Sequence, residues 1–128
     1  MINPDFHDIL SEFASAGVEY ILVGAYALAV HGFPRATGDI DLWVRCSDDN
    51  ARRVMTALAR FGAPLSEVTE RDFAAEGMVV QIGVAPRRID LLTSIDGVAF
   101  GDAWSERITA SIDDLVVPVL SREHLLRN

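Results

Sequence analysis

The chain is organised around one short stretch, Gly38-Asp39-Ile40-Asp41-Leu42-Trp43-Val44. Successive side chains of a β-strand point to opposite faces, so the three apolar residues at even positions would share one face. Asp39 and Asp41 would share the other face. The apolar face can pack on a core, and the two carboxylates offer the oxygen ligands that Mg²⁺ prefers. The alternative is an ordinary acidic strand face that contacts solvent.

A second acidic strand is predicted where residues 88–92 read Arg-Ile-Asp-Leu-Leu. Asp90 stands in the middle of this apolar run, and a buried carboxylate is costly unless it is paired or bound to a cation. If the two acidic strands are neighbours, three carboxylates converge and repel one another, and a divalent cation would relieve that repulsion. The alternative for Asp90 is a salt bridge to Arg87 or Arg88.

A strand also leads directly into a helix near the start of the chain. Residues 19–23 read Glu-Tyr-Ile-Leu-Val, which predicts a buried strand, and Gly24 and Ala25 connect it to a helix over 26–31. Glycine lets a ligand approach the backbone, and free N–H groups at a helix start attract anions such as phosphate. A tight turn without a ligand is the alternative.

Two further residues precede the first acidic strand in a loop that contains proline and glycine. Arg35 and Thr37 lie there, at residues 33–38. Arg35 could neutralise a phosphate or pair with Asp39 or Asp41, and the sequence leaves both open. His31 lies at the end of the preceding helix, where we expect a local hydrogen bond or a helix cap in preference to catalysis.

Composition limits the function classes. The 128 residues, half of them hydrophobic, predict one domain over 1–128 with a real core. A net charge of −8 argues against a broad nucleic-acid surface. All eleven basic residues are arginines, which excludes a lysine nucleophile and leaves arginine and backbone N–H groups to bind phosphate. No apolar run could span a membrane and no signal pattern opens the chain, so we expect a cytoplasmic protein.

The remaining elements follow from periodicity and turn residues. The sequence predicts further helices over 4–16, 51–61 and 70–75, a short helix within 97–106 and one beginning at Ser121, and further strands over 78–84, 107–111 and 115–120.

Val23-Gly24-Ala25, followed after thirteen residues by Asp39-Ile40-Asp41-Leu42, resembles the signature of the DNA polymerase β-like nucleotidyltransferase superfamily. The chain also resembles one branch of this superfamily, the minimal nucleotidyltransferases related to the abortive-infection toxins of prokaryotic toxin–antitoxin systems. The stretches that carry this resemblance are residues 20–27, 32–44, 81–84, 88–98 and 121–128. The resemblance implies an α/β (α+β) fold, a mixed β-sheet flanked by helices, as in the polymerase β palm. The family usually continues past the position of Asn128, which implies that this chain lacks the C-terminal helical extension.

The resemblance also implies an activity, the transfer of a nucleoside monophosphate from an NTP to a hydroxyl of a tRNA, a protein or a small molecule. It implies three metal-binding catalytic carboxylates, Asp39, Asp41 and Asp90, with one or two Mg²⁺ ions, and nucleotide-binding residues Gly24, Ala25, Arg35 and Thr37. Ala25 stands where many members have glycine or serine. An antitoxin or another partner protein is implied as well. The alternative is a nucleotide-binding or partner-binding module with an incomplete or vestigial transferase site.

Overall fold

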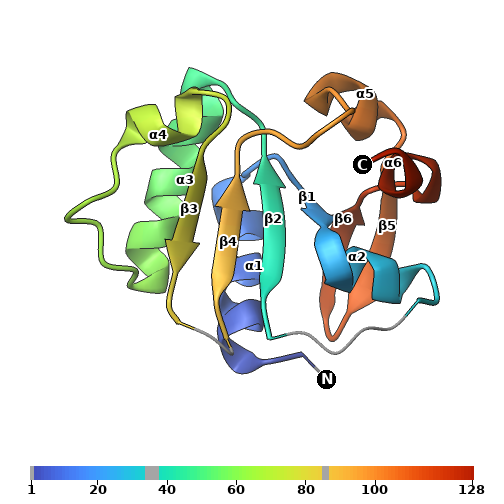
Figure 1. The fold of residues 1–128 in the computed structure, drawn as a ribbon. Coiled ribbons are helices and arrows are strands. Elements are labelled where there is room, and N and C mark those ends of the chain that lie inside the picture. Colours follow the sequence, from blue (N-terminus) through green and yellow to red (C-terminus); the bar gives the residue numbers. More distant parts are fainter. Residues whose placement is uncertain (1, 34–37, 85–86) are drawn as a thin grey trace.

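A computed structural model describes residues 2–33, 38–84 and 87–128. Within these residues six strands form one mixed sheet with the order β3-β4-β2-β1-β6-β5, and helices lie on both of its faces (Figure 1). The strands are β1 (Tyr20–Val23), β2 (Ile40–Val44), β3 (Val79–Ile82), β4 (Ile89–Leu92), β5 (Ile108–Ile112) and β6 (Leu115–Val119). The predicted fold class, a mixed sheet flanked by helices, is confirmed.

The helices are α1 (Pro4–Ala16), α2 (Gly24–Val30), α3 (Asp48–Phe61), α4 (Glu70–Ala74), α5 (Phe100–Ser105) and α6 (Arg122–Arg127). The two longest helices begin and end at the residues that cap chemistry predicts. The Asn3 side chain accepts from a first-turn N–H of α1, and Gly17 ends that helix in the left-handed conformation. Ser47 and Gly62 do the same for α3. Among the described residues, no helix has the length and apolar character needed to cross a membrane.

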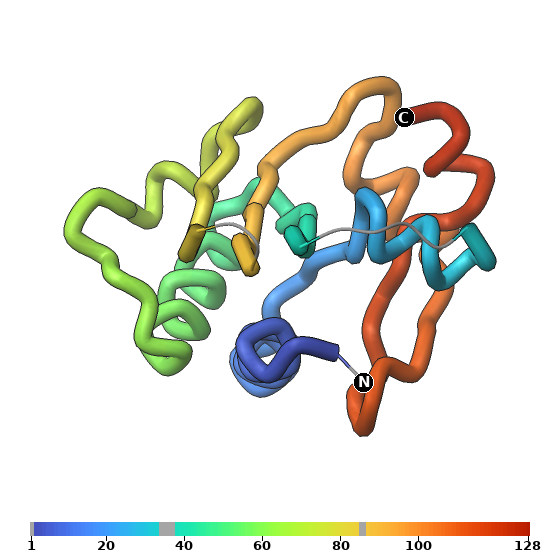
Figure 2. Tube along the Cα trace, turned by 60° about the horizontal axis from the view of Figure 1, so that its bottom comes forward, coloured from blue at the N-terminus to red at the C-terminus, as the bar shows by residue number. Residues whose placement is uncertain are grey.

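The sheet buries both of its faces. One core contains side chains of α1 and α3 together with Leu42, and the other contains Trp43 and Leu120 together with side chains of β1 and α5. Figure 2 shows α1 and α3 on one side of the strands and the C-terminal segment on the other. The face that carries the acidic residues was expected to meet solvent or a ligand, yet it also carries Trp43, which is 1% exposed because α5 covers it.

Strand β2 lies between β1 and β4 and positions the acidic residues (Figure 1). It runs antiparallel to β1 and parallel to β4. In this register Asp41 is opposite Val23 on one side and opposite Asp90 on the other. The two acidic strands are therefore neighbours, and α2 begins directly beside them.

Asn50 fastens the start of β1 and the end of β2 to α3. Its side chain is 2% exposed. The amide oxygen accepts from the Glu19 N–H at 2.8 Å, and the amide nitrogen donates to the carbonyls of Glu19 and Arg45, both at 2.9 Å. A buried side chain that satisfies three backbone groups fixes their relative positions. The Asn50 side chain therefore holds the start of β1 and the end of β2 against the first turn of α3.

Candidate active site

Three carboxylates meet on β2 and β4. Asp39 directly precedes β2, Asp41 is its second residue, and Asp90 is the second residue of β4. Ile40 and Ile89, which alternate with these acids, point into the core formed with α1 and α3. The carboxylates therefore share the opposite face of the sheet, and the structure brings together the three residues that the sequence singled out.

Arg88 joins two of these acids. Its Nε and Nη2 atoms donate to the two carboxylate oxygens of Asp90 at 2.7 and 3.1 Å, and Nη2 also donates to Asp39 Oδ2 at 3.0 Å. The Asp90 side chain is only 10% exposed, so this forked contact compensates much of its burial. The salt bridge that the sequence offered as an alternative for Asp90 is present, and it comes from Arg88.

Asp41 has an unusual protonation equilibrium. Burial, followed by the charge of Asp90, a hydrogen bond with Asp90 and the charge of Asp39, raises its pKa to about 6, while the charge of Arg88 acts in the opposite direction. Close carboxylates cannot all ionise freely, because each negative charge disfavours the next. Below this pKa the Asp41 carboxyl holds a proton, which it shares with Asp90 in the hydrogen bond.

Gly24 permits this close arrangement. It begins α2 with a φ of +71°, and a β-carbon at this position would overlap Asp41 Oδ2 and stand 3.0 Å from Asp41 Cγ. Both the backbone conformation and the lack of space therefore require glycine. The backbone of Gly24 consequently passes directly against the Asp41 carboxylate, at the start of α2, with Ala25 as the next residue.

A pocket opens at this point of the molecule. Its lining residues come from the end of β1, the start of α2, the strands β2 and β4, the loop after β4 and the C-terminal residue: Val23, Gly24, Asp41, Leu92, Ser94, Ile95, Asp96 and Asn128. The Asn128 side chain donates to the Asp96 carbonyl at 2.9 Å and so closes one wall. Ser94, Asp96 and Asn128 were not predicted as site residues. The only signal in the sequence was that they lie in the stretches 88–98 and 121–128 that resemble the family.

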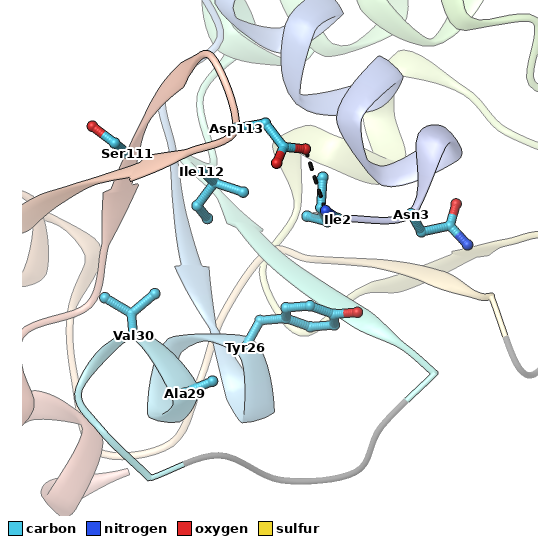
Figure 3. Close-up of a pocket in the computed structure, with 8 residues that line it drawn as sticks. All are labelled: Ile2, Asn3, Tyr26, Ala29, Val30, Ser111, Ile112 and Asp113. Carbon is cyan, nitrogen blue, oxygen red and sulfur yellow. Dashed lines mark hydrogen bonds between the residues drawn. The ribbon is translucent and has the colours of Figure 1, made fainter.

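A second pocket lies between α2, the N-terminal segment and the β5–β6 hairpin (Figure 3). Figure 3 shows the Asp113 carboxylate turned toward the Ile2 backbone N–H, which donates to it at 3.2 Å. Tyr26 and Val30 supply part of the apolar lining. This pocket contains none of the three converging acids, and its one carboxylate is already hydrogen bonded. The pocket beside Asp41 is therefore the candidate active site.

The other predicted residues have different outcomes. Ala25 lies in the first turn of α2, next to Gly24. Arg35 and Thr37 fall outside the described residues, so their roles stay predictions. His31 lies within 2.8 Å of the Leu120 carbonyl through Nε2, which fastens the end of α2 to the end of β6. This contact is structural, as expected, but it is distant in sequence and not local.

No protein-family model and no curated protein matches this sequence. Among solved structures, the chain is similar to one described as a "putative nucleotidyltransferase" from Thermotoga maritima, with a TM-score of 0.64. The alignment covers 98% of this chain and 83% of the other. The chain has a nucleotidyltransferase fold. At 16% sequence identity the likeness concerns the fold, and the chemistry has to be argued from the residues of the site.

Proposed function

We propose that this protein is a metal-dependent nucleotidyltransferase that moves a nucleoside monophosphate from an NTP to a hydroxyl group and releases pyrophosphate. One observation carries the proposal. On a nucleotidyltransferase fold, Asp41 and Asp90 are direct neighbours in a parallel strand pair, and the glycine turn at the start of α2 lies against Asp41.

The donor chemistry of the three acids fits Mg²⁺, since carboxylate oxygens are its preferred protein ligands. The repulsion that raises the pKa of Asp41 is also what a cation relieves. As they are placed, however, no group of three or more His, Cys, Asp or Glu side chains among the described residues could hold a metal ion. Asp39 and Asp90 would therefore have to turn from Arg88 before Asp39, Asp41 and Asp90 could bind one or two ions together.

Each residue of the site has a proposed role. The backbone N–H groups of Gly24 and Ala25 bind the phosphates of the NTP, and Arg35 and Thr37 support them from the preceding loop. Asp90 assists the incoming hydroxyl, either as a metal ligand or as the base that takes its proton. When bound, Mg²⁺ supplies positive charge for the attacking and leaving oxygens.

The acceptor is the open part of the proposal. A tRNA end, a protein side chain and a small molecule all present a suitable hydroxyl, although a net charge of −8 disfavours a long RNA footprint. A role in a toxin–antitoxin pair, with an antitoxin as partner, and a cytoplasmic location where NTPs are abundant belong to the same proposal. The contacts of Arg88 with Asp39 and Asp90 favour one alternative, a module that binds nucleotides or a partner without transfer.

The test is transfer of label from α-³²P-labelled ATP, GTP, CTP and UTP in Mg²⁺, with bulk tRNA and the chain itself as acceptors. We expect label transfer by the wild-type chain and none by Asp41→Asn, because the amide is a much poorer metal ligand than the carboxylate. Glu67→Gln makes the same charge change at an exposed position and should transfer normally. Equal transfer by Asp41→Asn and wild type would refute the assignment. Binding of NTP without transfer would favour the binding module.

A further inference from the structure

The Arg88 guanidinium occupies the position that a metal ion bound by these carboxylates would take. Its guanidinium contacts both carboxylate oxygens of Asp90 and one oxygen of Asp39. The side chains of Arg88 and Asp39 are about one-third exposed, at 30% and 31%, whereas that of Asp90 is 10% exposed. The guanidinium is thus held at the rim of the site, with a deeper carboxylate beneath it.

A divalent cation and Arg88 require the same atoms. A cation shared by Asp39, Asp41 and Asp90 needs carboxylate oxygens that now accept hydrogen bonds from Arg88. Each of these oxygens has a limited number of lone pairs, and two positive charges at one point repel each other. Occupation by one cation therefore disfavours occupation by the other.

The displaced guanidinium would need a new anionic partner. Its planar fork suits a phosphate group as well as it suits a carboxylate. The chain contains no lysine, so a polyphosphate must be bound by arginine side chains and backbone N–H groups. Arg88 is exposed enough to turn outward. The glycine turn after β1 faces Asp41 on β2, which is the strand between β1 and β4.

We propose that Arg88 is an internal counter-ion that competes with divalent metal for Asp39 and Asp90, and that it pairs with the triphosphate of the NTP once the metal has displaced it. The nucleotide half of this inference rests on the proposed function, whereas the metal half stands on the contacts of Arg88 alone. In the free protein Arg88 keeps metal affinity low. Metal and nucleotide bind well only together. The metal releases Arg88 from Asp39 and Asp90, and the triphosphate pairs with the released guanidinium and so leaves these carboxylates to the metal.

The first experiment measures metal without nucleotide. Free Mn²⁺ is followed by electron paramagnetic resonance, and Mg²⁺ by calorimetry, for wild type, Arg88→Ala and Arg87→Ala. Arg87 is the exposed neighbour, so its substitution makes the same change in net charge away from the acids. We expect Arg88→Ala to bind metal about tenfold more tightly, which corresponds to about 1.4 kcal/mol. Arg87→Ala should stay within about twofold of wild type, since exposed charges at a distance are screened.

The second experiment measures binding of each NTP at saturating Mg²⁺. Here the effect should reverse, and Arg88→Ala should bind nucleotide about tenfold more weakly than wild type, again about 1.4 kcal/mol. Arg88→Lys keeps the charge and should lie between the two in both experiments. If Arg88→Ala does not fold, Arg88→Gln provides an uncharged side chain that can still donate to one carboxylate.

Two results would overturn the inference. Metal binding by the Arg88 variants that is unchanged or weaker would mean that Arg88 holds the acids in position and does not compete with the metal. Undetectable metal binding in every variant would remove the competition altogether. Tighter metal binding without nucleotide binding in any variant would support the counter-ion and refute the phosphate contact together with the proposed transferase activity, so the two failures can be told apart.

Discussion

Asp41→Asn should stabilise the fold while it abolishes transfer. The pKa of Asp41 rises from 3.8 to about 6 on folding because burial and the neighbouring carboxylates disfavour its charge. A raised folded-state pKa means that the native state holds the proton more tightly than the unfolded chain. The stabilisation from this carboxyl is thus complete below about pH 4, and it is lost as the pH rises through about 6.

The expected gain in the free energy of unfolding follows from the rise in the Asp41 pKa. A rise in the Asp41 pKa from 3.8 to about 6 corresponds to about 3 kcal/mol, at about 1.36 kcal/mol per pKa unit. Asp41 is only half-buried, and solvent screening reduces this figure to about 1–2 kcal/mol. Asparagine stays neutral at every pH, and its amide can donate to Asp90 as the protonated carboxyl does. The variant should therefore match wild type near pH 4 and exceed its free energy of unfolding by about 1–2 kcal/mol at pH 8.

Thermal unfolding followed by circular dichroism, from pH 4 to pH 8 in EDTA, measures this effect. For a domain of this size the gain at pH 8 corresponds to an increase in Tm of roughly 4–8 °C. Glu67→Gln is the control, because it removes one exposed negative charge from the same acidic chain. Added Mg²⁺ should then raise the Tm of wild type at pH 8 more than that of Asp41→Asn, since only a ligand of the native state stabilises it.

Two results would contradict the expected repulsion at Asp41. A gain that is equal at pH 4 and pH 8, or no larger than that of Glu67→Gln, would show that Asp41 does not experience the repulsion inferred from the positions of Asp39 and Asp90. A loss of stability at pH 8 would show that the ionised Asp41 carboxylate makes a favourable contact, and the carboxylates would then not be in conflict.

Two further substitutions test the geometry. Gly24→Ala should destabilise the fold by about 2–4 kcal/mol and remove nucleotide binding, because the new methyl overlaps Asp41 and the φ of Gly24 is positive. Gly32→Ala is the control: Gly32 has a φ of +92° and open space around it, so the substitution should cost only about 1–2 kcal/mol. Equal costs of the two substitutions in urea unfolding would contradict this reasoning. Asn50→Ala removes three hydrogen bonds and leaves the Glu19 N–H and the Arg45 carbonyl without their Asn50 partner, while the Glu19 carbonyl keeps the Arg45 N–H. The variant should cost about 3 kcal/mol in the same assay, and a loss below about 1 kcal/mol would mean that water replaces these hydrogen bonds.

Local chemistry explains why much of the fold was predictable. Asn3, Gly17 and Ser47 act at helix ends through contacts within a few residues, so their effect can be read without knowing the tertiary structure. The alternation around Asp41 and Asp90 also fixes which residues share a face. Their convergence required one further condition, that β2 and β4 be neighbours, and the structure meets it.

What the sequence could not provide depends on contacts between distant segments. Both Arg87 and Arg88 were candidates to pair with Asp90, and only the path of β4 decides that Arg88 reaches Asp39 as well. The acidic face was expected to be open, but α5 covers the part of it that carries Trp43. Likewise the contact of His31 with a carbonyl 89 residues away has no local signal.

The centre of the sheet therefore carries two opposing requirements. Folding favours neutral or paired carboxylates, and the free protein meets this with Arg88 on Asp39 and Asp90 and, below about pH 6, with a proton that Asp41 shares with Asp90. The proposed chemistry needs the same carboxylates ionised and free to bind a cation. Under the proposed function Arg88 has to leave these carboxylates before a cation can bind, and below about pH 6 the Asp41 proton has to leave as well. Substitutions that relieve this conflict should raise stability and lower activity together, which distinguishes an active-site conflict from ordinary surface repulsion.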